Sequence, residues 1–134
     1  MPRRRGLKSK KENKVSMQRN RVEIVGFLTK KPEVHHTMEG TPVTEFSLGV
    51  NETFNGEKKQ QISTFIECQL WGKSAESLAK FADKGEELFV EGALRQSKWK
   101  DRDTGRDRQK LFVRCDSWQF TQHLEKAPEQ EVEQ

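Results

Sequence analysis

Apolar and polar side chains alternate along most of the chain between residues 21 and 120. This period of two predicts β-strands that each bury one face. Turn-forming residues, such as the Gly and Pro between residues 38 and 42, separate the alternating runs. The expected strands are 21–29 with a short continuation at 33–37, then 43–53, 61–71, a fourth from about residue 88, and 109–120.

The period changes once, between the third and fourth expected strands. Lys84-Gly85 supplies a basic last turn and a glycine that ends a helix. An all-β chain with one helix between strands three and four has the layout of the OB-fold, a five-stranded, partly open barrel. A generic α+β sandwich is the structural alternative, but mid-strand glycines such as Gly49 favour the barrel. The residues at the i, i+3, i+4, i+7 spacing of one helix face are Ala75, Leu78, Ala79 and Ala82.

Charge is distributed unevenly along the 134 residues. Residues 1–19 hold eight Lys and Arg against the single acid Glu12, and residues 123–134 hold four Glu against Lys126. The middle therefore balances 16 basic against 16 acidic residues, because the whole chain has 25 and 21. We expect a disordered basic arm at 1–19, one folded domain at 20–122 and a short acidic tail at 123–134. The arm is either a solvated segment or one that attracts phosphate.

Several large aromatic side chains fall on the parity that faces water. Phe65 and Trp71 lie opposite the buried parity of the third strand, about 20 Å apart at ~3.3 Å per residue. Trp99 takes the outward parity of the fourth strand, and Phe54 opens an expected polar loop at 54–59. Exposed rings are unfavourable unless something covers them, and nucleic-acid bases stack on such rings in a sequence-tolerant way. The alternative is that these rings belong to the core or to a subunit interface.

Cations accompany these rings. Residues 95–110 carry seven Lys and Arg against three Asp, with Arg95 and Lys98 close to Trp99, and a long basic hairpin loop is expected at 98–108. Lys73 follows the third strand, and Arg21 begins the first. A basic groove beside stacking rings is typical of proteins that bind single-stranded nucleic acid. The other aromatic residues are expected in the core or an interface, namely Phe27, Phe46, Phe81, Phe89, Phe112, Trp118 and Phe120.

Three segments of the sequence resemble bacterial single-stranded DNA-binding proteins. They are 20–33, 71–76 and 84–95, the last followed by Ser-Lys-Trp at 97–99. The resemblance spans 20–122 and implies an OB-fold that binds single-stranded DNA without sequence specificity, as a homotetramer, in replication, recombination and repair. The family's stacking positions correspond to Phe54, Phe65, Trp71 and Trp99, and its basic contacts to Arg21, Lys73, Arg95 and Lys98.

The sequence departs from this family at both ends. The family's long linker and acidic tip, closing with Pro-Phe, recruits replication and repair proteins. Here the acidic residues at 129–134 carry no Pro-Phe, so recruitment through such a tip is not expected. The basic arm is longer than the family's usual start, and it either supplements DNA affinity or serves as an address signal. Three stacking positions differ in ring type, with Phe at 54 and 65 and Trp at 71, yet each remains a platform.

The sequence offers no catalytic or metal-binding constellation. His35 and His36 are adjacent, so they point to opposite faces of a strand, and no metal site or cofactor is expected. Cys68 shares its parity with Leu70, and Cys115 shares its parity with Leu111 and Val113, which predicts that these residues are buried. Two buried thiols indicate a reducing, intracellular setting. Neither a transmembrane segment nor a signal peptide is predicted, so we expect a cytoplasmic, nucleoid-associated protein.

The sequence therefore predicts a non-enzymatic protein that binds and protects single-stranded DNA. One alternative is an OB-fold primosome-type or scaffold protein whose outward rings contact another protein. A second is an RNA-binding OB-fold, because base stacking does not distinguish the two sugars.

Overall fold

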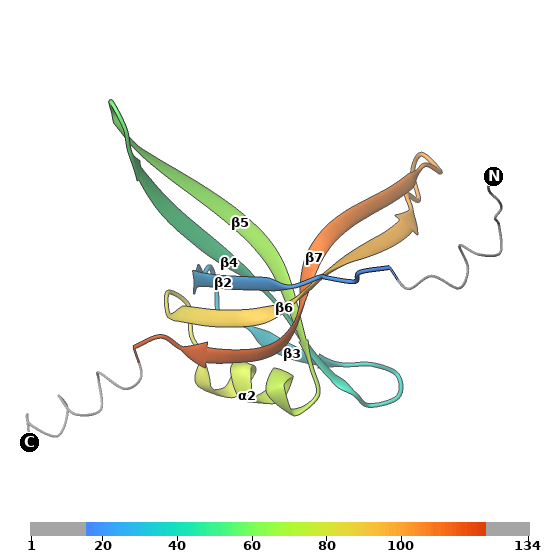
Figure 1. The fold of residues 1–134 in the computed structure, drawn as a ribbon. Coiled ribbons are helices and arrows are strands. Elements are labelled where there is room, and N and C mark those ends of the chain that lie inside the picture. Colours follow the sequence, from blue (N-terminus) through green and yellow to red (C-terminus); the bar gives the residue numbers. More distant parts are fainter. Residues whose placement is uncertain (1–15, 123–134) are drawn as a thin grey trace, which may run out of the picture.

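Residues 16–122 are described by the computed structural model, which places six strands and one helix among them (Figure 1). The predicted tail, and the predicted arm apart from residues 16–19, lie outside the described residues. In chain order the elements are β2 (Val22–Leu28), β3 (Glu33–His36), β4 (Pro42–Asn55), β5 (Lys59–Trp71), α2 (Lys73–Phe81), β6 (Glu87–Lys100) and β7 (Asp107–Phe120).

Five of the strands close into a barrel. Hydrogen bonding gives the order β2-β6-β7-β5-β4-β3, and a further pairing of β2 with β4 joins the sheet to itself. Phe27 pairs with Gly49 at this closure, and Leu28 with Leu48. The expected five-stranded barrel is confirmed. The short strand β3 pairs with β4 beyond the closure, so the predicted continuation at 33–37 is confirmed as well.

The core lies inside the barrel, and α2 packs against it. Thr44 is fully buried and donates its hydroxyl hydrogen to the carbonyl oxygen of Ala75 at 2.8 Å, which ties α2 to β4. Lys31 donates to the carbonyl oxygens of Ala79 and Ala82, so the last turn of the helix has partners for its otherwise unpaired carbonyls. The largest fully buried apolar side chains are Leu28, Leu48, Leu70, Leu78, Leu88, Val90 and Val113.

Two long hairpins extend from the barrel on the side away from α2, and they diverge (Figure 1). At residues 50–64 the recorded pairings of β4 and β5 are with each other, and the same holds for β6 and β7 at residues 95–112. We call these two segments the β4–β5 arm and the β6–β7 arm. They carry strand structure away from the barrel and expose both faces of each ribbon.

The arms correct two sequence predictions about loops. The loop expected at 54–59 is reduced to residues 56–58, because β4 continues to Asn55 and β5 begins at Lys59. Phe54 therefore lies in a strand. The basic loop expected at 98–108 shrinks to residues 101–106. Polar residues fit both faces of an exposed two-stranded ribbon, so a polar run does not end the strand.

Three apolar residues expected to be covered are exposed in this single chain. Leu111 was expected inside with Val113, but it lies on the β6–β7 arm beyond the barrel and is 61% exposed. Phe81, at the end of α2, is also 61% exposed, and Phe27 is exposed at the barrel closure. Phe46 is buried, and Trp118 packs against Phe120 at the edge of the core, both as expected.

Candidate nucleic-acid interface

One side of the sheet made by β5, β7 and β6 faces away from the core and continues onto the β6–β7 arm. The ladder fixes its members, because Gln69 pairs with Arg114, Arg114 with Ala93, and Trp99 with Arg108. Residues paired in this way project from the same side of a sheet. We call this side the outer face. Its members are Phe65, Glu67, Gln69, Trp71, Ala93, Arg95, Ser97, Trp99, Arg108, Lys110, Phe112 and Arg114.

Three of the four aromatic residues singled out from the sequence lie on the outer face. Phe65 is 68% exposed and Trp99 is 45% exposed, as the alternation of their strands predicts. Trp71 shares the face, as the alternation of its strand predicts, but it is only partly exposed. All three sit on one continuous sheet.

Phe65 lies across a glycine of the neighbouring strand. A Cβ atom built on Gly49, its cross-strand partner, would stand 3.1 Å from Cε1 and 3.4 Å from Cδ1 of the ring. The ring therefore occupies the space that a side chain at position 49 would fill. With one side against the sheet and most of its surface exposed, Phe65 forms a flat platform.

Trp71 is held in place by two contacts on the same face. Its indole Nε1–H donates to Oε1 of Gln69 at 2.6 Å. The guanidinium of Arg114 lies over the ring, 4.7 Å from its centre. The orientation of the indole is thus fixed by side chains of β5 and β7.

The β6–β7 part of the outer face is basic and hollowed. No described carboxylate forms an ion pair with Arg95, Lys110 or Arg114, whereas Arg108 is 3.7 Å from Asp101. Two hollows border these cations. One, of about 220 Å³, is lined by Lys110 and Phe112 together with the carboxylates of Glu45 and Glu67. Another, of about 550 Å³, is lined by Lys98, Trp99, Lys100 and Arg108 together with Asp107.

The β4–β5 part of the same side is acidic. Glu67 lies between Phe65 and Gln69 on the outer face of β5 and is exposed. Glu45 of β4 pairs with Gln69 in the ladder, and its carboxylate accepts a hydrogen bond from the Gln69 amide at 3.4 Å. The aromatic platforms therefore join a basic region on β6–β7 to an acidic region on β4–β5.

Comparison with known proteins identifies the family that has this architecture. Residues 19–121 match the Single-strand binding protein family. The chain belongs to this family. The single-stranded DNA binding protein from Thermus aquaticus, in the crystal structure of a deletion mutant, superposes with a TM-score of 0.66 and 25% identity. That match covers 75% of this chain and 49% of the Thermus chain. The barrel is thus the one found in this family.

Named relatives are similar to much of the chain. Single-stranded DNA-binding protein 2 of Listeria innocua is 39% identical over 84 residues, which are 63% of this chain and 53% of that protein. Single-stranded DNA-binding protein A of Bacillus subtilis is 37% identical over 94 residues, 70% of this chain and 52% of that protein. The chain thus spans about half the length of these family members.

In this family member, two of the predicted site residues project from the side of their strands opposite to the outer face. Phe54 pairs with Gln60, so by alternation it projects from the side of the β4–β5 arm opposite to Phe65, where it is 48% exposed. Lys98 likewise alternates with Trp99 along β6, although it borders the hollow around that ring. The structure therefore does not gather the four predicted rings on one face.

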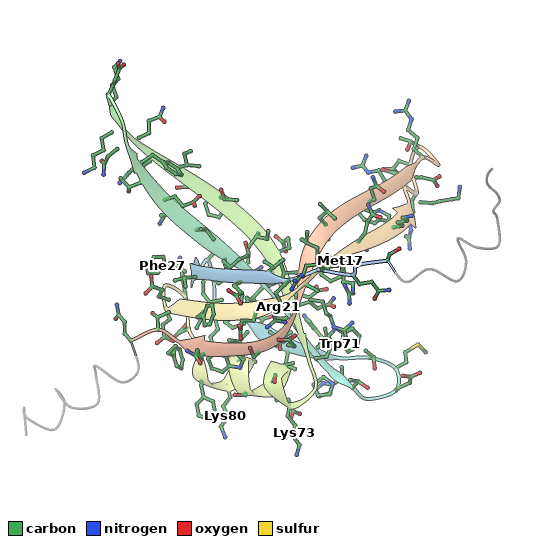
Figure 2. All side chains as sticks on the ribbon, viewed as in Figure 1. Met17, Arg21, Phe27, Trp71, Lys73 and Lys80 are labelled. Atoms are coloured by element: carbon green, nitrogen blue, oxygen red, sulfur yellow. The ribbon has the colours of Figure 1, made fainter. Side chains whose placement is uncertain are left out.

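The two remaining predicted cations lie outside the outer face. Arg21 forms ion pairs with Asp116 at 3.0 Å and with Glu91 at 3.4 Å. The hydrogen bond to Asp116 raises the pKa of the Arg21 guanidinium. Lys73 is exposed at the start of α2 and points away from both arms (Figure 2). Of the predicted cations, Arg95 is the one that lies on the outer face.

Sequence reasoning did not single out Arg114, Lys110, Arg108 or Phe112 as site residues, yet all four lie on the outer face. One local signal was present for Arg114, because it alternates with the buried residues Val113 and Cys115 and must point outward. Its position beside Trp71 depends on the pairing of β5 with β7, which is not local.

No group of three or more His, Cys, Asp or Glu within residues 16–122 is placed to hold a metal ion. In that same range, α2 falls short of the length and apolar content needed to cross a bilayer.

Proposed function

We propose that this protein binds single-stranded DNA, without sequence preference, on its outer face. One observation carries the proposal: Phe65, Trp71 and Trp99 share one face of a continuous sheet with the cations of β6 and β7. Bases would stack on the rings, and phosphates would contact Arg95, Arg108 and Lys110. The relatives named above, which match 63% and 70% of this chain, are single-stranded DNA-binding proteins by name.

The other predicted residues have peripheral roles in this proposal. Phe54 and Lys98 continue the path where DNA passes around the edge of an arm. Arg21 and Lys73 lie outside the path. Lys73 acts through longer-range attraction of the phosphates, which salt screens, whereas the two carboxylates paired with Arg21 offset most of its attraction.

The proposal extends to the whole protein. It binds and protects DNA without catalysis, in the cytoplasm beside the nucleoid, and it supports replication, recombination and repair. The barrel is an OB-fold with α2 between its third and fourth strands, and the working form is a homotetramer. Family membership supports these points, and a single small barrel offers a short track for DNA.

Binding of a dye-labelled oligo(dT), followed by anisotropy at two salt concentrations, tests the proposal. Stacking is worth about 1–3 kcal/mol per base, so Trp99→Ala and Phe65→Ala should each weaken binding by roughly 5- to 150-fold. Phe81→Ala is the matched control, because this ring is similarly exposed but lies on α2. The logarithm of affinity should fall by about 0.7 per phosphate contact for each tenfold rise in salt.

Unchanged affinity in both Trp99→Ala and Phe65→Ala would refute the proposed interface. Competition by poly(rU) against oligo(dT) addresses the RNA-binding alternative, since a protein selective for RNA would prefer poly(rU). A scaffold protein would bind oligo(dT) only through residues 1–19, so deleting them would abolish binding.

A further inference from the structure

Arg114 covers the ring of Trp71, on which the proposed function stacks a base. Its guanidinium carbon lies 4.7 Å from the centre of the Trp71 indole. In the ladder, Arg114 sits opposite Gln69, the residue that accepts the indole N–H. The ring is therefore fixed along one edge and covered on one side.

Strand β4 flanks β5 on the side away from β7, the strand that carries Arg114. Val43 pairs directly with Trp71 and shares its side of the sheet, yet only 8% of Val43 is exposed. Directly paired side chains on one side of a sheet are close neighbours. With this covered valine beside Trp71 on the β4 side, a base that stacks on the indole competes with Arg114 for the ring.

We propose that Arg114 contacts bound DNA, and that in the free protein its guanidinium stacks on Trp71 instead. When a strand binds, the guanidinium leaves the indole for a phosphate, and a base takes its place on the ring. This inference rests on the proposed function. The exchange is favourable, because an exposed cation–π contact is weak whereas an arginine–phosphate contact is charge-assisted and can be bidentate. No described carboxylate holds Arg114 back.

The exchange predicts the sign of the coupling between the two residues. In Trp71→Ala, Arg114 has no ring to leave, so its contact with phosphate contributes more to binding. Arg114→Gln should therefore weaken oligo(dT) binding by a factor about two- to five-fold larger in the Trp71→Ala background than in the wild type. Arg114→Gln should also lower the salt slope by about 0.7, whereas Arg114→Lys should retain the slope.

Anisotropy of a labelled oligo(dT) measures all four combinations, and thermal unfolding checks that each variant is folded. Lys80→Gln is the matched control, because Lys80 lies 5.2 Å over the ring of Phe81 on α2, outside the outer face. Its affinity and slope should match the wild type.

An opposite result would overturn the inference. If Arg114 stayed on the ring and merely supported it, Arg114→Gln would matter less in the Trp71→Ala background, and the salt slope would not change. If the wild type binds oligo(dT) and the variants show this pattern, the exchange is refuted but the proposed function is not. A wild type that does not bind oligo(dT) refutes the proposed function, and the exchange with it.

Discussion

Glu67 places a negative charge in the middle of the row of platforms. It shares the outer face of β5 with Phe65 and Gln69, its neighbours two residues away in each direction, and Trp71 follows two residues further on. A strand stacked on both rings would carry its phosphates past this carboxylate. Glu67→Gln removes the charge and keeps the shape of the side chain, so we expect it to tighten binding.

The size of the effect follows from the strand geometry. Same-face neighbours on a strand are about 7 Å apart, and Trp71 is about twice that distance from Glu67. The phosphates that pass beside Phe65 and Gln69, its nearest outer-face neighbours, therefore lie on the order of 8 Å from the Glu67 carboxylate. Two unit charges at that distance in water repel by about 0.5 kcal/mol. One or two such phosphates give a gain of roughly 2- to 5-fold in affinity at low salt. Screening should reduce the gain steeply, because the Debye length falls from about 10 Å at 0.1 M salt to about 3 Å at 1 M.

Oligo(dT) anisotropy at low and high salt measures this gain. Glu76→Gln serves as the control, because Glu76 is an exposed glutamate in the first turn of α2, outside the outer face. Unchanged or weaker binding by Glu67→Gln at low salt would show that DNA does not pass over β5. An equal gain in Glu76→Gln would attribute the effect to net charge and refute the argument from position.

Two further predictions concern the barrel itself. A Cβ on Gly92 would overlap the carbonyl oxygen of Arg114 and stand 2.7 Å from Cα of Cys115, so Gly92→Ala should lower the free energy of unfolding, measured in urea, by about 1–3 kcal/mol or more. Gly56→Ala is the control, because a Cβ at Gly56 meets open space and should change the stability little. Equal effects of the two substitutions would contradict the packing argument. Cys68 and Cys115 are 2% and 5% exposed, and hydrogen bonding to Cys115 together with burial raises the pKa of Cys68. Iodoacetamide should therefore label neither thiol in the folded protein and both thiols in urea. Labelling of the folded protein would refute their burial.

The aromatic platforms could be predicted from the sequence because alternation is a local property of a strand. Once Cys68 and Leu70 are assigned to the core, Phe65 and Trp71 must point outward, and the structure places them so. The helix likewise follows from a local change of period. Sequence reasoning is strongest here, where one buried face defines the other.

Phe54 shows where local reasoning fails. A polar run from residue 55 onward suggested a loop, yet cross-strand pairing continues through Asn55 and Lys59. That pairing puts Phe54 on the opposite side of the ribbon from Phe65. Arg114 was missed for a related reason, because its proximity to Trp71 arises from the parallel pairing of β5 with β7, strands that α2 and β6 separate along the chain.

Net charge gives no account of this interface, because residues 20–122 carry equal numbers of acidic and basic residues. The structure separates the two signs. Asp116 and Glu91 hold Arg21, and Asp107 holds Lys100, whereas no described carboxylate pairs with Arg95, Lys110 or Arg114. Phosphate attraction near a surface depends on cations within about a Debye length, and paired cations contribute little to it. The salt dependence of DNA binding should therefore arise mainly from the β6–β7 side of the outer face, and stacking on Phe65 should add affinity that salt leaves largely unchanged.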